Sequence, residues 1–202
     1  KSYNQATARL GDSVGLDSVI ETLKEMGQQR ELLAVPSLFI GTTQLAPVEV
    51  ASLYQTIATN GFRTPLKAIR SVLDKDGQPL ERFPYQTQQA GSVQSNYLIQ
   101  QALVHVGKYG SAVAASGRLG DGTFAGKTGT SQVRRISLSE RESDDFRKKE
   151  IEWEKRDHAL FAGYFPHNKP KYAFSIIVEH GGSGSSVAAP IARDVFKNLF
   201  KI

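Results

Sequence analysis

Two continuous apolar runs, residues 159–165 and 172–178, constrain the fold of this chain most strongly. Each has the length of a buried strand, and neither shows the spacing of an amphipathic helix. The turn-rich segment 166–170, Pro-His-Asn-Lys-Pro, separates them. The economical interpretation is a pair of adjacent antiparallel strands joined by a short connection.

Helical patterns precede these strands. Apolar residues recur at helical spacing over residues 17–26, and a second helix is expected to begin at Pro47 and to end at Asn60-Gly61. A third is expected over residues 93–106, and Tyr54 and Tyr97 are assigned to the core. The third helix is predicted to bury one apolar face, formed by Ile99, Ala102, Leu103 and Val106.

A hairpin is predicted among these helices, because two β-prone runs at residues 68–73 and 80–83 flank the turn signal Asp76-Gly77. Helices first, then strands and a final helix, predict an α+β fold without regular βαβ alternation. We interpret the glycine- and serine-rich segment 181–186 as flexible. The closing helix that follows contains Pro190 near its start, and its inward face is predicted to be Ile191, Val195, Phe196 and Leu199.

Composition excludes several classes of site. The 202 residues include no cysteine, which rules out disulfides and thiol catalysis. Net charge is +5, but the densest charge run, residues 131–157, mixes both signs, so no nucleic-acid partner is expected. The four histidines are dispersed, and no metal site is expected. No apolar run reaches the roughly 18 to 20 residues of a membrane span, and further sequence is expected upstream of Lys1.

Residues 125–131, Ala-Gly-Lys-Thr-Gly-Thr-Ser, are the segment most informative about chemistry. The tripeptide at residues 126–128 matches the end of a phosphate-binding loop, but Asp121 occupies the position where that pattern needs a glycine. A surface turn with a solvated lysine is a second alternative. The third is acyl transfer. Lys-Thr-Gly, combined with Ser-x-Asn and Ser-x-x-Lys, is the motif set of penicillin-binding proteins and active-site serine β-lactamases, and Ser2-Tyr3-Asn4 supplies the second element.

Each residue of the motif suits that chemistry. Lys127 offers a fixed positive charge to a substrate carboxylate, and the hydroxyls of Thr128 and Thr130 offer hydrogen bonds to the same group. Glycine at Gly129 lets a substrate backbone approach closely, and the amide of Thr130 is then predicted to be one oxyanion-hole donor. We therefore predict that residues 127–130 line the rim of a cleft.

The serine and the asparagine of the Ser-x-Asn motif receive complementary roles. Ser2 is expected to relay a proton to the leaving group, and Asn4 is expected to orient the bound acyl amide. Both must lie close to residues 127–130 for these roles to hold.

The wider sequence resembles the same family in two different ways. Residues 4–7, 45–51 and 55–61 are similar to the transpeptidase domain of bifunctional class A penicillin-binding proteins. Residues 126–135, 156–161 and 178–182 are similar to the monofunctional class B proteins of the elongation type. We interpret residues 1–202 as part of one transpeptidase domain, either an unusual natural sequence or a chimera joined between residues 110 and 125.

The resemblance implies a five-stranded antiparallel sheet flanked by helices, of which this chain supplies three strands. It also implies serine D,D-transpeptidase activity that cross-links peptidoglycan stem peptides, with β-lactam antibiotics as trapping ligands and no cofactor. A glycan polymerase or another cell-wall synthesis protein is an implied partner. The implied location is the periplasmic face of the bacterial inner membrane, with an anchor outside this chain. His180 is expected near the cleft, and Trp153 is expected to pack against a neighbouring loop or a partner.

The third motif is absent. No Ser-x-x-Lys occurs in the chain, since Ser71 and Lys75 are one residue too far apart. The nucleophile and its general-base lysine are therefore expected upstream of Lys1, and the chain by itself is predicted to be catalytically silent. A β-lactam-hydrolysing relative and a silent fragment that binds a peptide or a partner protein stay open as alternatives.

Overall fold

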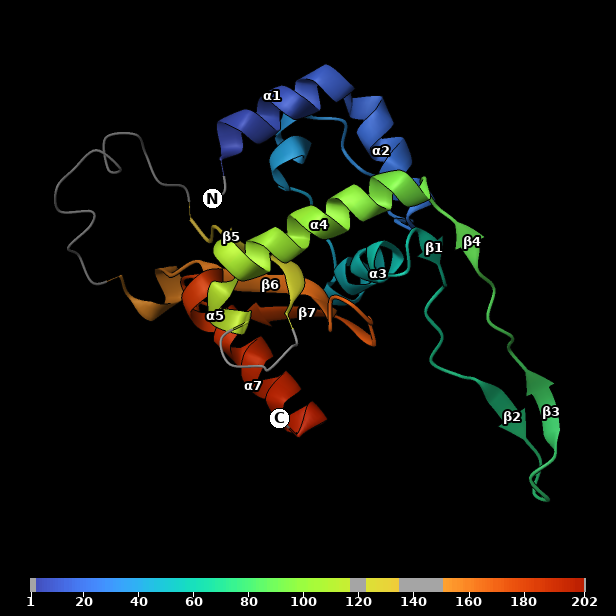
Figure 1. Cartoon of the computed structure of the whole chain (residues 1–202). Helices are drawn as coiled ribbons and strands as arrows, with labels where there is room; N and C mark the ends of the chain where they lie inside the picture. The colour runs from blue at the N-terminus through green and yellow to red at the C-terminus, as the bar shows by residue number, and fades with distance from the viewer. Residues whose placement is uncertain (1–2, 117–122, 135–150, 202) are drawn as a thin grey trace, which may run out of the picture. The chain divides into compact units, whose positions relative to one another are not determined.

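The computed structural model describes residues 3–116, 123–134 and 151–201 (Figure 1). It divides into two compact units, which we call the helical unit, within residues 2–100, and the sheet unit, within residues 101–202. All described strand pairs are antiparallel, and no regular βαβ alternation occurs among the described elements, as expected for the predicted α+β class. No helix in the described ranges is long and apolar enough to cross a membrane.

The helical unit contains the predicted helices near their expected bounds. Helix α3 begins at Pro47, and the carboxylate of Glu49 accepts a 2.6 Å hydrogen bond from the backbone N–H of Ala46 just before it. Tyr54 is half-buried in α3, and burial raises the pKa of its phenol to about 12. The helical elements are α1 (Asn4–Val14), α2 (Leu16–Glu25), the short η1 (Pro36–Ile40) and α3 (Pro47–Ala58).

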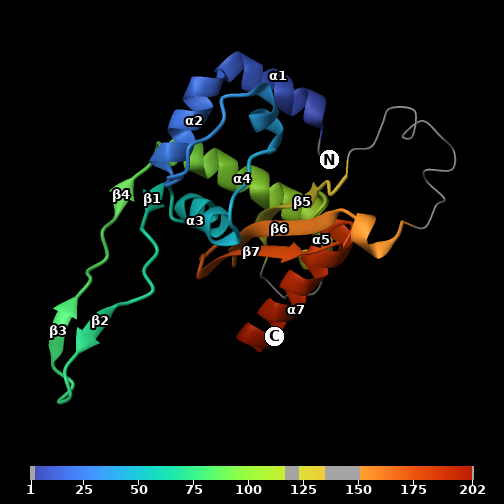
Figure 2. The ribbon, with the colours of Figure 1, turned by 180° about the vertical axis from the view of Figure 1, so that it is seen from behind.

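The predicted hairpin is confirmed in strands β2 (Ser71–Leu73) and β3 (Pro79–Arg82). Its turn is closed by the Oδ1 atom of Asp74, which accepts hydrogen bonds from the backbone N–H groups of Asp76 and Gln78. Figures 1 and 2 show the hairpin as an arm that extends beyond a second ladder, β1 (Phe62–Arg63) with β4 (Gln88–Gln89). That ladder is only two residues long, too short for the sequence pattern to predict.

Helix α4 (Val93–Tyr109) runs through the boundary between the two units, and its predicted buried face is partly wrong. Ile99 and Ala102 are exposed, and the buried positions are Asn96, Val104 and Gly107. Tyr97, assigned to the core, is also exposed. The buried stripe admits a polar Asn96 because its amide donates to the backbone carbonyl groups of Ala90 and Ser92.

The sheet unit contains the predicted strand trio. Strands β5 (Ala125–Ser131), β6 (His158–Phe165) and β7 (Tyr172–Val178) form an antiparallel sheet in the order β5-β6-β7. Thr128 faces Phe161 in this sheet, and Phe161 faces Ile176. The remaining elements are α5 (Val113–Ser116), η3 (Trp153–Lys155), η4 (Gly184–Ala188) and α7 (Ala189–Phe200).

An aromatic core joins the sheet to α7. The ring of Phe124 lies between 4.6 and 5.9 Å, centroid to centroid, from those of Phe161, Phe165, Phe174 and Phe196. Around these rings the chain uses alanine, which lets a helix backbone approach closely. The alanines buried in this cluster are Ala112, Ala115, Ala159, Ala188, Ala189 and Ala192.

This packing corrects the predicted inward face of the closing helix. Phe196 is buried as expected, but Ile191, Val195 and Leu199 are 39%, 50% and 52% exposed. The buried stripe instead follows Ala189, Ala192 and Phe196, since small side chains fit the close contact of α7 with α5 and η4.

The segment interpreted as flexible is packed against the sheet. The backbone N–H of Gly182 donates to the carbonyl of Asp157 at 2.7 Å, and Gly184 is buried. A Cβ on Gly184 would overlap the carbonyl oxygens of Gly129 and Leu160, so only glycine fits at this position. Gly184 therefore serves the close packing of η4 on β5 and β6.

Candidate active site

The Lys-Thr-Gly-Thr motif occupies the middle of β5, the outer strand of the described sheet. Gly126 and Gly163 face each other across the β5-β6 ladder, and a Cβ on Gly126 would lie 2.5 Å from the carbonyl oxygen of Ala162. The glycine pair thus lets the two strands approach closely. On an outer strand, alternate backbone N–H and C=O groups face away from the sheet. The motif therefore presents backbone donors and acceptors to an extended ligand.

Lys127 supplies the charge of this edge. Its side chain is half-buried, and its Nζ donates to the carbonyl oxygen of Thr128 at 2.7 Å. Burial lowers the pKa of the ammonium group from its ordinary value, because a desolvated charge is less stable. Among the residues that the structure describes, no carboxylate forms an ion pair with it. The ammonium group is thus suited to an anionic ligand.

The side chain of Thr128 is held by a hydrogen bond to Ser111, a residue outside the sheet. It is 6% exposed, and its Oγ1 donates a 2.6 Å hydrogen bond to the Oγ of Ser111, which lies between α4 and α5. Sequence reasoning missed Ser111. A lone serine after Gly110 at a helix end carries no signal, since its partner lies 17 residues further along the chain.

The two remaining motif residues are more open. Gly129 is half-buried and Thr130 is exposed. A Cβ on Gly129 would meet the side chain of Leu160 at 3.4 Å, an ordinary contact, so packing within the chain does not by itself demand glycine there. The close approach of a ligand that Gly129 is predicted to allow stays a prediction, as does the oxyanion-hole role of the Thr130 amide.

The second motif belongs to the part of the chain that forms the helical unit, whereas β5 belongs to the sheet unit. Ser2 lies outside the described residues, and Asn4 is exposed at the first position of α1, in the helical unit. Their predicted roles in proton relay and acyl-amide orientation therefore stay predictions. The structure brings together Lys127, Thr128, Gly129 and Thr130 because they share one strand.

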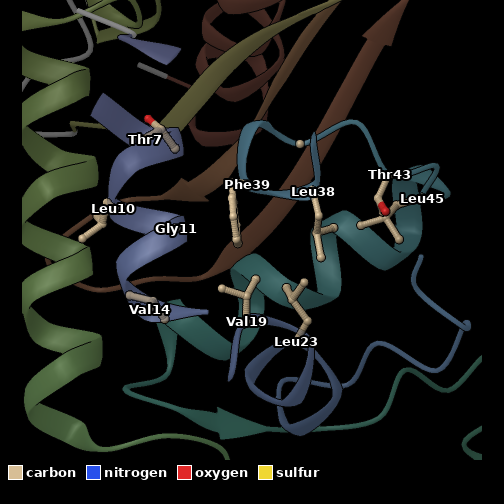
Figure 3. Close-up of a pocket in the computed structure, with 11 residues that line it drawn as sticks. Thr7, Leu10, Gly11, Val14, Val19, Leu23, Leu38, Phe39, Thr43 and Leu45 are labelled. Carbon is tan, nitrogen blue, oxygen red and sulfur yellow. The ribbon is translucent and has the colours of Figure 1, made fainter. Parts of the chain in front are cut away.

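A separate cavity of about 450 Å³ lies inside the helical unit, between α1, α2 and η1 (Figure 3). The ring of Phe39 packs over Gly11, where any Cβ would overlap it. The lining is almost entirely apolar and includes no ionisable side chain, so it offers nothing for acyl transfer. Its lining includes Leu10, Val14, Val19, Leu23, Leu38 and Leu45.

Comparison with known proteins identifies the family. The family model described as "Penicillin binding protein transpeptidase domain" matches residues 2–197. The chain belongs to this family. The resemblance predicted from the motifs at residues 2–4 and 127–130 is therefore confirmed.

Both kinds of relative expected from the sequence are found for this transpeptidase-family chain. It is 36% identical over 138 residues to penicillin-binding protein 1B of Vibrio cholerae, a class A protein, which covers 68% of the chain and 18% of the relative. It is 44% identical over 71 residues to the peptidoglycan D,D-transpeptidase MrdA of Haemophilus influenzae, a class B protein, covering 35% of the chain and 10% of the relative. The chain thus spans less than a fifth of either relative.

Solved transpeptidase structures share the fold. Penicillin-binding protein A from Mycobacterium tuberculosis, in its penicillin G acyl-enzyme complex, superposes with a TM-score of 0.74 at 23% identity. The match covers 98% of this chain and 46% of that one. The predicted fold class is confirmed, and the chain corresponds to about half of the solved chain.

Two histidines and a tryptophan meet where the motif strand of this transpeptidase fold ends. Ser131, the last residue of β5, pairs with His158, and the backbone N–H of His180 donates to His158 Nδ1 at 2.9 Å. His180 Nδ1 lies 3.0 Å from the carbonyl oxygen of Arg156, so that nitrogen carries a proton. Trp153 packs on His180 at 4.6 Å between ring centroids, so its predicted packing against a neighbouring loop is confirmed.

Proposed function

We propose that this chain is part of a serine D,D-transpeptidase that cross-links peptidoglycan stem peptides. The observation that carries the proposal is the half-buried ammonium of Lys127 on an outer strand, within a Lys-Thr-Gly-Thr motif. A desolvated cation that lacks a carboxylate partner in the described part of the sheet unit favours an anionic ligand. The C-terminal carboxylate of a stem peptide is such a ligand.

The proposed reaction has two steps. An active-site serine oxygen attacks the carbonyl carbon between the two D-alanine residues, a C–O bond forms, the C–N bond breaks, and D-alanine leaves with a proton. The amine of a second stem peptide then attacks the ester, a new C–N bond forms, the C–O bond to the serine breaks, and the proton lost by the amine returns to the serine oxygen. A β-lactam follows the first step and stays attached, since its ring opens without releasing a leaving group.

Residues of β5 are assigned to binding and charge stabilisation. Lys127, Thr128 and Thr130 hold the terminal carboxylate of the donor peptide. Because Gly129 has no side chain, the peptide can lie along the strand, and the amide of Thr130 donates to the developing oxyanion.

The remaining assignments concern the second motif and the nucleophile. Ser2 relays a proton to the leaving amine, and Asn4 orients the acyl amide. The nucleophilic serine and its lysine are assigned to sequence before Lys1, because the family pattern places Ser-x-x-Lys ahead of Ser-x-Asn and the 202 residues contain none. The chain by itself is accordingly proposed to be silent.

The relatives support the proposed ligands and location. One solved relative forms a penicillin G acyl-enzyme, and another relative is named as a peptidoglycan D,D-transpeptidase. We assign this protein the same ligands, with a glycan polymerase or another cell-wall protein as partner. Stem peptides are cross-linked outside the bacterial inner membrane, so the periplasmic face is the proposed location.

Labelling with a fluorescent penicillin tests the proposal. The full-length protein containing this chain is expected to form an adduct that survives denaturation, and the isolated chain is expected to form none. Label on the isolated chain would show that the nucleophile lies within residues 1–202. Steady turnover of the penicillin in place of a lasting adduct would identify a β-lactam hydrolase.

A further inference from the structure

Ser111 lies in the short turn between α4 and α5, which backbone hydrogen bonds and buried neighbours hold in place. The backbone N–H groups of Gly110 and Ala112 both donate to the carbonyl of Val106, at 3.0 and 3.4 Å. Ala112, the last residue of the turn, and Ala115, in α5, are fully buried. A Cβ on Gly110 would lie 2.9 Å from the backbone of Val106, so this turn requires glycine. The backbone from which the Ser111 side chain projects is therefore fixed in position.

The bond between Ser111 and Thr128 determines what the motif threonine can offer a ligand. A threonine hydroxyl has one proton, and Thr128 donates that proton to Ser111 Oγ at 2.6 Å. Its remaining lone pairs can only accept. A carboxylate also only accepts, so in this arrangement Thr128 has no hydrogen bond to give to a substrate carboxylate.

Thr128 can donate to a carboxylate if the donor and the acceptor of its hydrogen bond with Ser111 exchange roles. If both hydroxyls rotate, Ser111 donates to Thr128, and the proton of Thr128 becomes free for the carboxylate; no covalent bond changes. Lys127 cannot replace Ser111 as the partner of the Thr128 hydroxyl, because an ammonium group cannot accept a hydrogen bond. Its own hydrogen bond goes to the backbone carbonyl of Thr128. Ser111 can both accept and donate, so it satisfies the nearly buried Thr128 hydroxyl with and without ligand.

We propose that Ser111 is a positioning residue that sets the direction of the Thr128 hydrogen bond and so tunes recognition of a ligand carboxylate at β5. The inference rests on the proposed function and extends it to a residue outside the three motifs. Ser111 itself need not contact the ligand. Its effect is confined to ligands that carry the carboxylate.

The test compares benzylpenicillin with its carboxylate methyl ester in the full-length protein. Ser111→Ala is expected to lower the second-order acylation rate with benzylpenicillin roughly fivefold, because the Thr128 hydroxyl loses the partner that orients and polarises it towards the carboxylate. The rate with the ester is expected to change less than twofold. Ser111→Thr, which keeps the hydroxyl, is expected to retain the wild-type ratio. Ser13→Ala, which removes an exposed serine hydroxyl bonded to a backbone carbonyl, is the matched control.

Several outcomes decide the matter. The inference would be overturned if, in Ser111→Ala, both rates fell together, neither rate changed, or the rate with benzylpenicillin rose. If Ser111→Ala does not fold, Ser111→Cys decides, since its thiol is of similar size but a weak hydrogen-bonding group, and an intermediate ratio is expected. Wild-type protein acylated by neither compound would overturn the proposed function, and this inference with it; acylated wild type with an unchanged ratio overturns the inference alone.

Discussion

The sheet unit and the helical unit cover their apolar residues differently. In the sheet unit, Phe124, Phe161 and Phe165 are buried in one continuous cluster with six alanines and Phe196. In the helical unit, the buried hydrophobic residues of its described part, such as Leu32, Leu38 and Ala90, are separated, and an apolar cavity lies between its helices. The motif strand is thus held by the unit that has a closed core of its own.

Within the helical unit, the β2-β3 hairpin covers its apolar residues least. All seven residues of its two strands are exposed, including Leu73 and Leu80. A two-stranded ladder of this length is marginal without a packed face. Its residues therefore serve as matched controls for changes in the sheet unit.

The largest contrast is expected for a core aromatic residue. Phe161→Ala removes a fully buried ring that contacts Phe124 and Phe174, and it should lower the free energy of unfolding by about 3–5 kcal/mol. Leu80→Ala in the hairpin should change it by less than about 0.5 kcal/mol. Equilibrium denaturation in urea measures both. Equal losses would show that the hairpin is packed as closely as the core.

The next contrast concerns activity. Lys127→Met in the full-length protein should slow acylation by penicillin roughly 100-fold, the usual loss when a charge-stabilising group is removed. Lys75→Met, which removes an exposed lysine from the hairpin turn, should leave the rate unchanged. Stopped-flow measurement of adduct formation distinguishes them, and unimpaired acylation of Lys127→Met would remove the motif lysine from the proposed site.

The same variant has a pH signature in stability. Burial lowers the folded-state pKa of Lys127 below its ordinary value of 10.5, so the unfolded chain binds more protons between the two pKa values. The charged lysine therefore destabilises the fold at neutral pH, and this penalty fades as pH rises from the folded pKa towards 10.5. Lys127→Met should be at least as stable as wild type at pH 7, and the difference should shrink in alkaline buffer. Thermal unfolding at several pH values checks this.

The smallest contrast separates two reasons for glycine. Gly126→Ala places a Cβ 2.5 Å from the Ala162 carbonyl oxygen, which should force β5 and β6 apart and lower the free energy of unfolding by about 1–3 kcal/mol. Because Gly126 precedes Lys127, the same shift should slow acylation. Gly77→Ala meets no atom within 4 Å but needs a backbone φ of +77°, which should cost about 1 kcal/mol without affecting acylation. Urea denaturation and acylation rates together test the pair. Slower acylation in Gly77→Ala would break the distinction.

Local patterns determined most of the fold in advance. Pro47 at a helix start, Asp76-Gly77 in the hairpin turn, and the apolar runs of β6 and β7 each act through neighbouring residues, so the sequence alone predicts them. The family was also predicted from short motifs, since residues 127–130 are neighbours in the sequence and lie on one strand.

Tertiary structure decided which face each helix buries and what holds the motif. Ile191, Val195 and Leu199 are as apolar as a core requires, yet α7 buries its alanines, because the distance to its neighbours sets the side-chain size that fits. The Ser111–Thr128 bond and the packing of Gly184 on Gly129 join residues far apart in the chain. Periodicity specifies how a segment folds, whereas such contacts depend on where separate segments meet, and only the folded chain determines that.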